Sequence, residues 1–459
     1  MELGGNGALF ACLPEQPAPE RAGGGRPRLR MAERRQIELR AVSLDQLVPA
    51  DHRVRLVWRF VEGLDLAGLY QTIKAVEGRP GYPAADPRIL LALWLHATIE
   101  GVGSARALAR LCREHLAFQW LCGGVGMNAK TLADFRVEHG AALEQLLIDS
   151  FTALIQAGVA SLERVAQDGV RVRASAGAAS FRRRSTLQAC RGQAEAAVRR
   201  LRGELDADPA LASRRQAAAR RRAAEDRERR VKEALAVAEA LHVEQQALLR
   251  KRALRAARQG KAQGKKADEK PEKEPRASTT DAQARVMKMP DGGFRPAYNV
   301  QFASDTRSGA VAGVSVDNNG SDMGKMAPMS ATLADHYGLR PRQHLADGGF
   351  AKLDDIDALA QAGVETYVPV PSPRDGTRDR HVPQAGDPPG VALWRQRMGG
   401  EAATAIYRQR AATAECVNAQ ARNRGLRQVL VRGLDKVKAI ATWYALAHNM
   451  ACGWRLAEA

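Results

Sequence analysis

The stretch RVAQDGVRV, residues 164–172, marks a change from a helical to a strand-forming pattern. It alternates between polar and apolar residues and is rich in valine, as half-buried strands are. The preceding residues carry apolar side chains at helical spacing, and glycines interrupt the runs. Strand patterns return only after Pro290. The stretch therefore predicts the first strand of a sheet that follows a helical region and is interrupted by a long insertion.

The residues after Pro290 predict the rest of this sheet. Two strands joined by a hairpin turn come first, and helices alternate with short strands afterwards. Together with the first strand and the insertion, this is the element order of a ribonuclease-H-like mixed α/β core. The predicted strands are 295–304, 309–316, 343–346 and 365–370. The predicted helices are 352–362 and one from Ser321-Asp322 to about Tyr337, and the last region, 400–458, is predicted to be helical.

The helical region before the first strand contains clear start and stop signals. Asp86-Pro87 opens one helix, Ser104 caps the next after a glycine turn, and a third is predicted from Thr131. Arginines follow the turn, at Arg106 and Arg110. The pattern suggests a helix-turn-helix-like unit. An ordinary helical hairpin that binds nothing is an equal alternative.

The insertion is strongly basic. Residues 181–276 contain 27 Lys/Arg and 14 Asp/Glu, a net charge of +13. Their pattern predicts two antiparallel helices, which are separated by a break at Asp208-Pro209. Residues 260–280 are predicted to be a linker. One interpretation is a basic arm that lies along DNA phosphates. The alternative is a solvated helical hairpin whose acids pair with its bases.

Charge and composition narrow the function. The 459 residues have a formal charge of +19 and a pI near 10.1, which favours a polyanionic partner such as nucleic acid. No apolar run reaches membrane-spanning length, and no signal peptide is recognisable. Six cysteines without a CxxC pair fit a reducing cytoplasm. We expect a multidomain α+β chain: a lead-in 1–38, an all-helical DNA-binding domain 39–160, a catalytic core 161–186 plus 281–459, and the insertion and linker 187–280.

Three acids fall where a ribonuclease-H-like core collects them: Asp168 on the first strand, Asp347 after the fourth strand, and Glu415 in the C-terminal helical region. Carboxylates are hard oxygen ligands suited to Mg²⁺. A pair of such ions suits phosphoryl transfer to DNA. Other roles stay open, because Asp168 and Asp347 could be turn or cap residues and Glu415 a solvated helix residue.

Several motifs, in this order, resemble the DDE transposases of bacterial insertion sequences. They are SARALARLCREHLAFQWLCGG and TLADFR in the helical region, QDGVRVRASA around Asp168, RPAYNVQFASD from Arg295, ADGGF around Asp347, and YRQRAATAECVNAQARNRGLRQVLVRGLDKV from Tyr407. The resemblance implies that Asp168, Asp347 and Glu415 are catalytic and bind two Mg²⁺ ions, with Mn²⁺ able to substitute.

The family's glutamate helix also bears a Tyr, an Arg and, seven residues after the Glu, a Lys. Tyr407 and Arg410 match the first two, and Arg422 replaces the Lys. Arg410 stands one residue further from Glu415 than is usual. On an ideal helix five residues correspond to about 140°, which predicts that Arg410 faces away from Glu415. Glu415 and Arg422 should face one site.

The resemblance implies a polynucleotidyl transferase that cuts element ends and joins the 3′-hydroxyl to target DNA. Its expected partners are the terminal inverted repeats and target DNA, bound by a homodimer or larger assembly in the bacterial cytoplasm, at the nucleoid and not at a membrane. A transposase that has lost catalysis and only binds DNA is the main alternative, and a hydrolytic nuclease is a third. The predicted DNA-binding residues are Arg106, Arg110, Lys130, Arg136, Tyr407, Arg410 and Arg422.

Overall fold

The structure is a computed structural model, which describes residues 41, 43–78, 81–207, 214–258, 274–373 and 379–457. The predicted lead-in 1–38 and most of the linker 260–280 lie outside these residues. Residues 44–459 form one compact unit. None of the helices within the described ranges is both long and apolar enough to cross a membrane.

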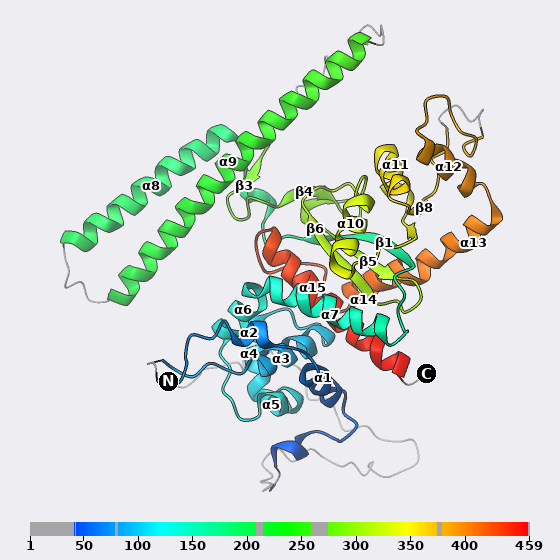
Figure 1. The fold of residues 1–459 in the computed structure, drawn as a ribbon. Coiled ribbons are helices and arrows are strands. Elements are labelled where there is room, and N and C mark those ends of the chain that lie inside the picture. Colours follow the sequence, from blue (N-terminus) through cyan, green and yellow to red (C-terminus); the bar gives the residue numbers. More distant parts are fainter. Residues whose placement is uncertain are drawn as a thin grey trace, which may run out of the picture. The chain divides into compact units, whose positions relative to one another are not determined.

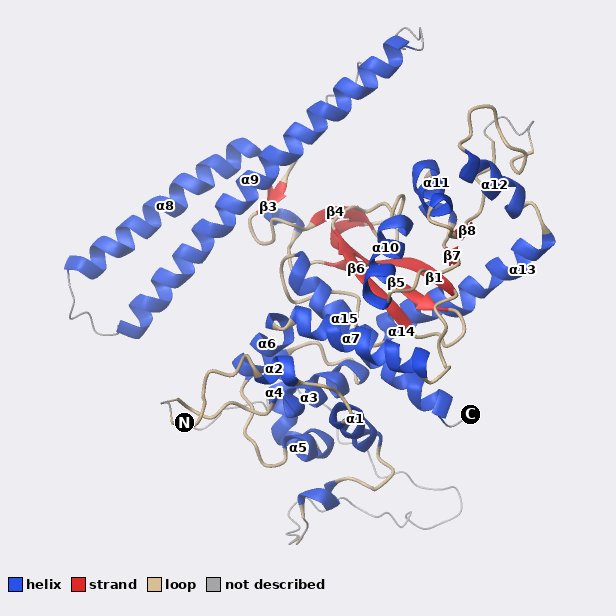
Figure 2. Ribbon diagram, in the orientation of Figure 1, coloured by secondary structure: helices blue, strands red, loops and turns tan. Residues whose placement is uncertain are grey.

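The six-stranded sheet is built around β1 (Arg164–Arg173). On one side β1 pairs antiparallel with β5, which pairs in turn with β4 and β6. On the other side β1 pairs parallel with β7, and β7 pairs parallel with β8. The order β6-β5-β1-β7-β8 is that of a ribonuclease-H-like sheet (Figure 2), as the sequence predicted. The other strands are β4 (Arg285–Lys288), β5 (Phe294–Asp305), β6 (Val311–Asp317), β7 (Gln343–Leu345) and β8 (Glu365–Tyr367).

Side chains of β1 alternate between two covered faces of the sheet. Asp168 and Val170 belong to one face, on which α14 (Cys416–Asn423) and α15 (Leu434–Ala457) pack. Val165 belongs to the other, where it packs with residues of α10 (Met326–Tyr337). The strand carrying Asp168 is thus held between helical layers.

The N-terminal helices share one hydrophobic core with the C-terminal helix. Trp443 of α15 donates to the carbonyl of Arg136, and Lys438 pairs with Glu144. Asp86 and Ser104 cap their helices, as predicted. The domain boundaries proposed from the sequence stay a prediction, since residues 44–459 pack as a single unit. The helices are α1 (Arg53–Glu62), α2 (Ala67–Tyr70), α3 (Pro87–Ile99), α4 (Ala105–Glu114), α5 (Leu116–Cys122), α6 (Ala129–Glu138) and α7 (Gly140–Gln156).

The insertion leaves and rejoins the core through a second, two-stranded sheet. In it β2 (Phe181–Arg182) pairs with β3 (Ala277–Ser278). Between them α8 (Arg184–Ala207) lies antiparallel to the first part of α9 (Arg214–Arg258), as predicted, and α9 continues past it (Figure 1). Ion pairs between the two helices fix this arrangement: Arg202–Glu225, Lys232–Glu195 and Arg184–Glu239.

Three sequence predictions about element bounds are wrong. Asp322 does not cap α10, which begins at Met326, because its carboxylate accepts hydrogen bonds from Asn299 and Gln301. The helix expected from Thr131 is two, α6 and α7, divided at His139. The expectation that strands return only after Pro290 is wrong as well, since β4 precedes that residue. The remaining helices are α11 (Leu353–Gln361), α12 (Pro389–Met398) and α13 (Glu401–Arg410).

Candidate active site

Strand register brings Asp168 and Asp347 together. In the parallel pair of β1 and β7, Arg164 lies beside Gln343 and Ala166 beside Leu345. Asp347 lies two residues beyond the last of these pairs, in the turn after β7, so the pairing directs it towards Asp168, which lies two residues further along β1. Asp168 lies on the face of β1 that α14 covers, since its carboxylate accepts a hydrogen bond from Asn418. Residues 179 positions apart in the sequence thus become neighbours.

The Asp168 carboxylate is held by one side chain and one backbone group. Asn418 of α14 donates from Nδ2 to Oδ2 at 2.9 Å, and the amide of Gly169 donates to Oδ1 at 2.8 Å. Burial raises the pKa of Asp168, and the charge of Asp347 raises it further, although the two hydrogen bonds oppose the change. The effect of Asp347 on this pKa is a second sign that the two acids are close.

Asp347 occupies the turn that follows β7. Its Oδ1 accepts from the amide of Gly349 at 2.8 Å, and it caps the short 3-10 helix η3 (Gly348–Phe350). Phe350 is buried and anchors this turn in the hydrophobic cluster that includes Val368 and Trp394. The capping role considered from the sequence is therefore real, and it holds the carboxyl in place without excluding a ligand.

Glu415 follows a wide helical turn. The helix changes from α13 to a π-helical turn, η4 (Ala411–Glu415), and then to α14. Hydrogen bonds in a π-turn join residues five apart, so such residues share a face. Arg410 pairs accordingly with Glu415 through Nη2 and Oε1. The prediction that Arg410 faces away from Glu415 is wrong, because it assumed ideal α-helical geometry.

Arg410 lies between the acids and an aromatic ring. Its guanidinium carbon is 5.6 Å from the ring centroid of Tyr407. Burial alone would lower the pKa of Arg410, but Tyr407, Glu415 and Asp168 together outweigh burial and raise it. The arginine thus offsets charge on two of the three predicted acids, and Tyr407 forms one wall of the site.

The residues present suit a divalent cation in their chemistry. Asp168 and Asp347 offer hard oxygen donors that are close enough for their charges to interact. Beside them the Oδ1 atom of Asn418 is buried without a hydrogen-bond partner among the described residues. Glu415 instead faces Arg410, and no group of three His, Cys, Asp or Glu in the described chain is arranged to hold a metal ion. A metal would therefore require Glu415 to turn from Arg410 towards the two aspartates.

The face of β1 opposite Asp168 carries a polar network that sequence reasoning missed. Asn299 and Gln301 each donate to Asp322 Oδ1 at 2.6 Å. A Cβ atom at Gly169 would lie 2.4 Å from that same oxygen. Only glycine therefore fits next to Asp168. The alternation of β1 was the available signal, since it turns residue 169 away from the acids and into this network.

The predicted DNA-binding residues of the helical region differ in exposure. Arg106, Arg110 and Lys130 are exposed, and the last two pair with Glu114 and Asp134. Arg136, by contrast, is buried. It stacks 4.3 Å from the ring centroid of Trp94 and donates to the carbonyl of Gly103, and burial lowers its pKa to about 10. Arg136 therefore packs the helical core and does not form part of an exposed DNA interface.

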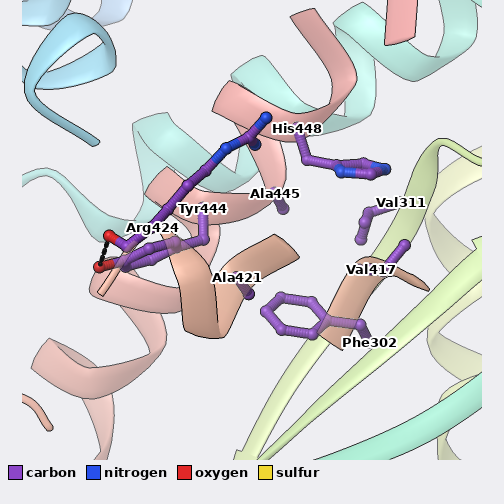
Figure 3. A pocket seen from close by; sticks show the side chains of 8 residues that line it. All are labelled: Phe302, Val311, Val417, Ala421, Arg424, Tyr444, Ala445 and His448. Carbon is purple, nitrogen blue, oxygen red and sulfur yellow. Dashed lines mark hydrogen bonds between the residues drawn. The ribbon is translucent and has the colours of Figure 1, made fainter. Parts of the chain in front are cut away.

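Behind α14 the chain is closely packed. Figure 3 shows a small cavity lined by residues of β5, β6, α14 and α15, in which Tyr444 donates to the carbonyl of Arg424. Its volume of about 10 Å³ leaves room for a water molecule at most. Val417 and Ala421 fill the adjoining space. The apolar side of α14 is thus fixed against the core, which also fixes the direction of its polar side.

Two family models match the chain. The model described as "Transposase domain (DUF772)" matches residues 42–138, and the model described as "Transposase DDE domain" matches residues 261–450. The helical region and the acid-bearing sheet together therefore define a transposase. No curated protein and no solved structure matches the chain significantly.

The chain belongs to the DDE transposases of bacterial insertion sequences, for which this pair of domains is typical. This family generally uses divalent metal ions and acts on DNA. The DDE match contains Asp347 and Glu415, whereas Asp168 precedes it. The assignment of Asp168 therefore depends on the register between β1 and β7.

Proposed function

We propose that this transposase cleaves DNA at the ends of an insertion sequence and transfers the freed 3′-hydroxyl to target DNA, with Asp168, Asp347 and Glu415 as its catalytic acids. The observation that supports the proposal is the parallel pairing of β1 with β7, which directs Asp347 towards Asp168, together with the effect of the Asp347 charge on the pKa of Asp168. A folding role alone does not require an acid within β1 to lie close to an acid in the turn after β7, where their charges repel each other.

The residues divide the work by position. Asp168 and Asp347 would hold Mg²⁺, and Glu415 would join them after leaving Arg410. Two such ions supply charge stabilisation for the attacking and leaving oxygens of an in-line displacement. Asn418 orients the Asp168 carboxyl through its hydrogen bond. Arg410, freed from Glu415, is then available to bind a phosphate oxygen next to Tyr407.

DNA binding is assigned to basic residues that are exposed or half-buried. Arg106, Arg110 and Lys130 of the helical region would contact terminal repeats, and Arg422 would contact the strand near the acids. The α8–α9 hairpin is proposed to lie along DNA phosphates. A dimer or larger assembly would hold both ends of the element, in the bacterial cytoplasm at the nucleoid. Mn²⁺ should substitute for Mg²⁺ because it accepts the same oxygen ligands.

The test compares cleavage with binding. Duplex DNA carrying the ends of the element that encodes the chain is incubated with Mg²⁺. Asp168→Asn and Asp347→Asn should each slow cleavage at least about 100-fold, the scale expected when one preorganised electrostatic group is removed. End binding, followed by fluorescence anisotropy, should change little because the basic surfaces are untouched.

Asp335→Asn is the matched control, since Asp335 is an exposed acid on α10. It should leave both cleavage and binding unchanged. Near-normal cleavage by either site variant would refute the metal role. Binding without any cleavage by the unaltered protein would favour the alternative of a transposase that has lost catalysis.

A further inference from the structure

A pocket lined with arginines lies beyond the acids. Its volume is about 370 Å³, and it lies between the end of β1, the turn between β4 and β5, and the end of α14. We call it the arginine pocket. Its charged lining residues are Arg171, Arg173, Arg295, Arg422, Arg427 and a single acid, Asp291.

Three of the five guanidinium groups already have partners. Arg295 pairs with both oxygens of Asp291, which uses the pocket's acid. Arg171 donates to the carbonyls of Lys288 and Gly320, and Nε of Arg427 donates to the carbonyl of Arg422. Arg171 also forms an ion pair with Asp322 at 3.9 Å, so acids offset the charges of Arg295 and Arg171, whereas Arg427 is held by a backbone oxygen that leaves its charge unneutralised.

The other two guanidinium groups are available. Within the described chain, no hydrogen bond or ion pair engages the side chain of Arg173, which is exposed, or of Arg422, which is half-buried. Like charges gathered around one cavity repel each other unless an anion offsets them. Guanidinium groups bind phosphate oxygens in bidentate fashion, so a phosphate is the anion that this lining suits best.

The pocket shares two elements with the acids. Arg171 and Arg173 follow Asp168 on β1 by three and five residues, which is about 10–17 Å along a strand, and these odd offsets direct their side chains to the opposite face of the sheet from Asp168. Arg422 follows Glu415 by seven residues, about 10 Å along a helix. With an axial rise of about 3.4 Å per nucleotide, these lengths correspond to about three to five nucleotides.

We propose that the arginine pocket binds a backbone phosphate of the DNA strand that is cut, about three to five nucleotides from the phosphate at the acids. This inference rests on the proposed function, because it takes DNA as the substrate and the acids as the reacting end. A phosphate held there fixes the strand lengthwise, so that the correct phosphodiester reaches Asp168 and Asp347.

The test removes the charge on each side of the pocket. The double variant Arg173→Gln/Arg422→Gln should bind an end duplex at least about ten-fold more weakly, with a salt dependence of log affinity shallower by about 0.9 for each phosphate that the variant no longer neutralises. The matched control is Arg340→Gln, an exposed arginine outside the pocket, which should change neither quantity. The charge-conserving variant Arg173→Lys/Arg422→Lys should keep the salt slope while its affinity falls.

The position of the bound phosphate is tested with modified DNA. Duplexes carry one neutral methylphosphonate at successive positions from the cleaved phosphate. The unaltered protein should bind more weakly when the methylphosphonate is at positions three to five, and the glutamine double variant should show no further weakening there. A uniform weakening at all positions, or an equal weakening in both proteins, would overturn the proposal.

Free phosphate is the other source of the same chemistry. Inorganic phosphate that competes at millimolar concentration, without any position-dependent effect of methylphosphonates, would make the pocket a free-anion site and refute a strand contact. Failure of this proposal differs from failure of the proposed function. The first leaves the cleavage defect of Asp168→Asn intact, whereas the second abolishes the difference between Asp168→Asn and Asp335→Asn.

Discussion

The sheet around β1 and the α8–α9 hairpin both contain many charged residues, but the residues that interact are separated by very different distances along the sequence. In the hairpin, acids pair with bases three or four positions away, as in Arg191–Glu195, or with the adjacent helix. In the sheet, Asp168 meets Asn418 across 250 positions. Local charge patterning thus organises the hairpin, whereas topology organises the site. A change in the sheet should consequently have larger effects than a comparable change in the hairpin.

The two regions can be followed separately in one sample. All six tryptophans and all seven tyrosines lie outside residues 181–276. Intrinsic fluorescence therefore reports on the core alone, whereas far-ultraviolet circular dichroism also reports on the helices of the hairpin. The following predictions use this separation.

The largest effect on stability is expected at Gly169. An added Cβ would lie 2.4 Å from both Asp322 Oδ1 and Gln301 Nε2, so Gly169→Ala must displace buried, hydrogen-bonded groups. Overpacking of this kind costs about 1–3 kcal/mol. Urea unfolding followed by tryptophan fluorescence should show the decrease in stability. A midpoint equal to that of the unaltered protein would contradict this prediction, because it would show that the hydrogen-bond network around Asp322 rearranges without loss of stability.

Gly192→Ala is the matched substitution in the hairpin. Gly192 is exposed within α8, and nothing lies within 4 Å of its added Cβ. Alanine in a helix is favoured over glycine by roughly 0.5–1 kcal/mol. The variant should therefore raise the unfolding midpoint measured by circular dichroism and leave the midpoint measured by fluorescence unchanged. The effect is opposite in sign to that of Gly169→Ala.

An intermediate effect is expected from acid. His344 on β7 is fully buried, and burial lowers its pKa to about 4, whereas an unfolded histidine titrates near 6.5. The unfolded chain therefore takes up protons first, and stability should be lost as the pH falls from 6.5 towards 4. One pH unit within this range corresponds to about 1.4 kcal/mol.

His344→Gln removes this titrating group and keeps an amide that can donate to Gln167, the partner of His344. Urea midpoints from fluorescence at pH 7, 6 and 5 should fall less steeply in the variant. His96 and His448, whose pKa values burial also lowers to about 4, supply the remaining dependence. Identical pH slopes for the two proteins would contradict the role of His344.

The smallest effect on the core is expected from removing the hairpin. Deletion of residues 187–276 joins chain ends that the β2–β3 pair already holds together, so the fluorescence midpoint should change little. If the hairpin lies along DNA, the salt dependence of binding should become shallower by about 0.9 for each phosphate that the hairpin neutralises. We expect a change of several units. An unchanged slope in the folded variant would mean that the acids of the hairpin satisfy its bases.

The fold was largely predictable because its signals are local. Alternation located β1, and cap residues such as Asp86 located helix starts. The closeness of Asp168 and Asp347 was predicted only through the fold and the family resemblance, because it depends on how β1 and β7 pair. The burial of Arg136 could not be predicted either, because arginine side chains are usually exposed and the sequence does not show that Trp94 packs against this one. The arginine pocket required three segments to converge.

The π-helical turn before Glu415 has a consequence for recognising related chains. One extra residue between Arg410 and Glu415 would rotate an α-helix by about 100°, but the wider turn absorbs it, and the two side chains still pair. What selection can preserve here is the direction of a side chain, while the number of residues between two positions is free to drift by one. A search pattern for this glutamate should therefore allow a variable gap after the arginine.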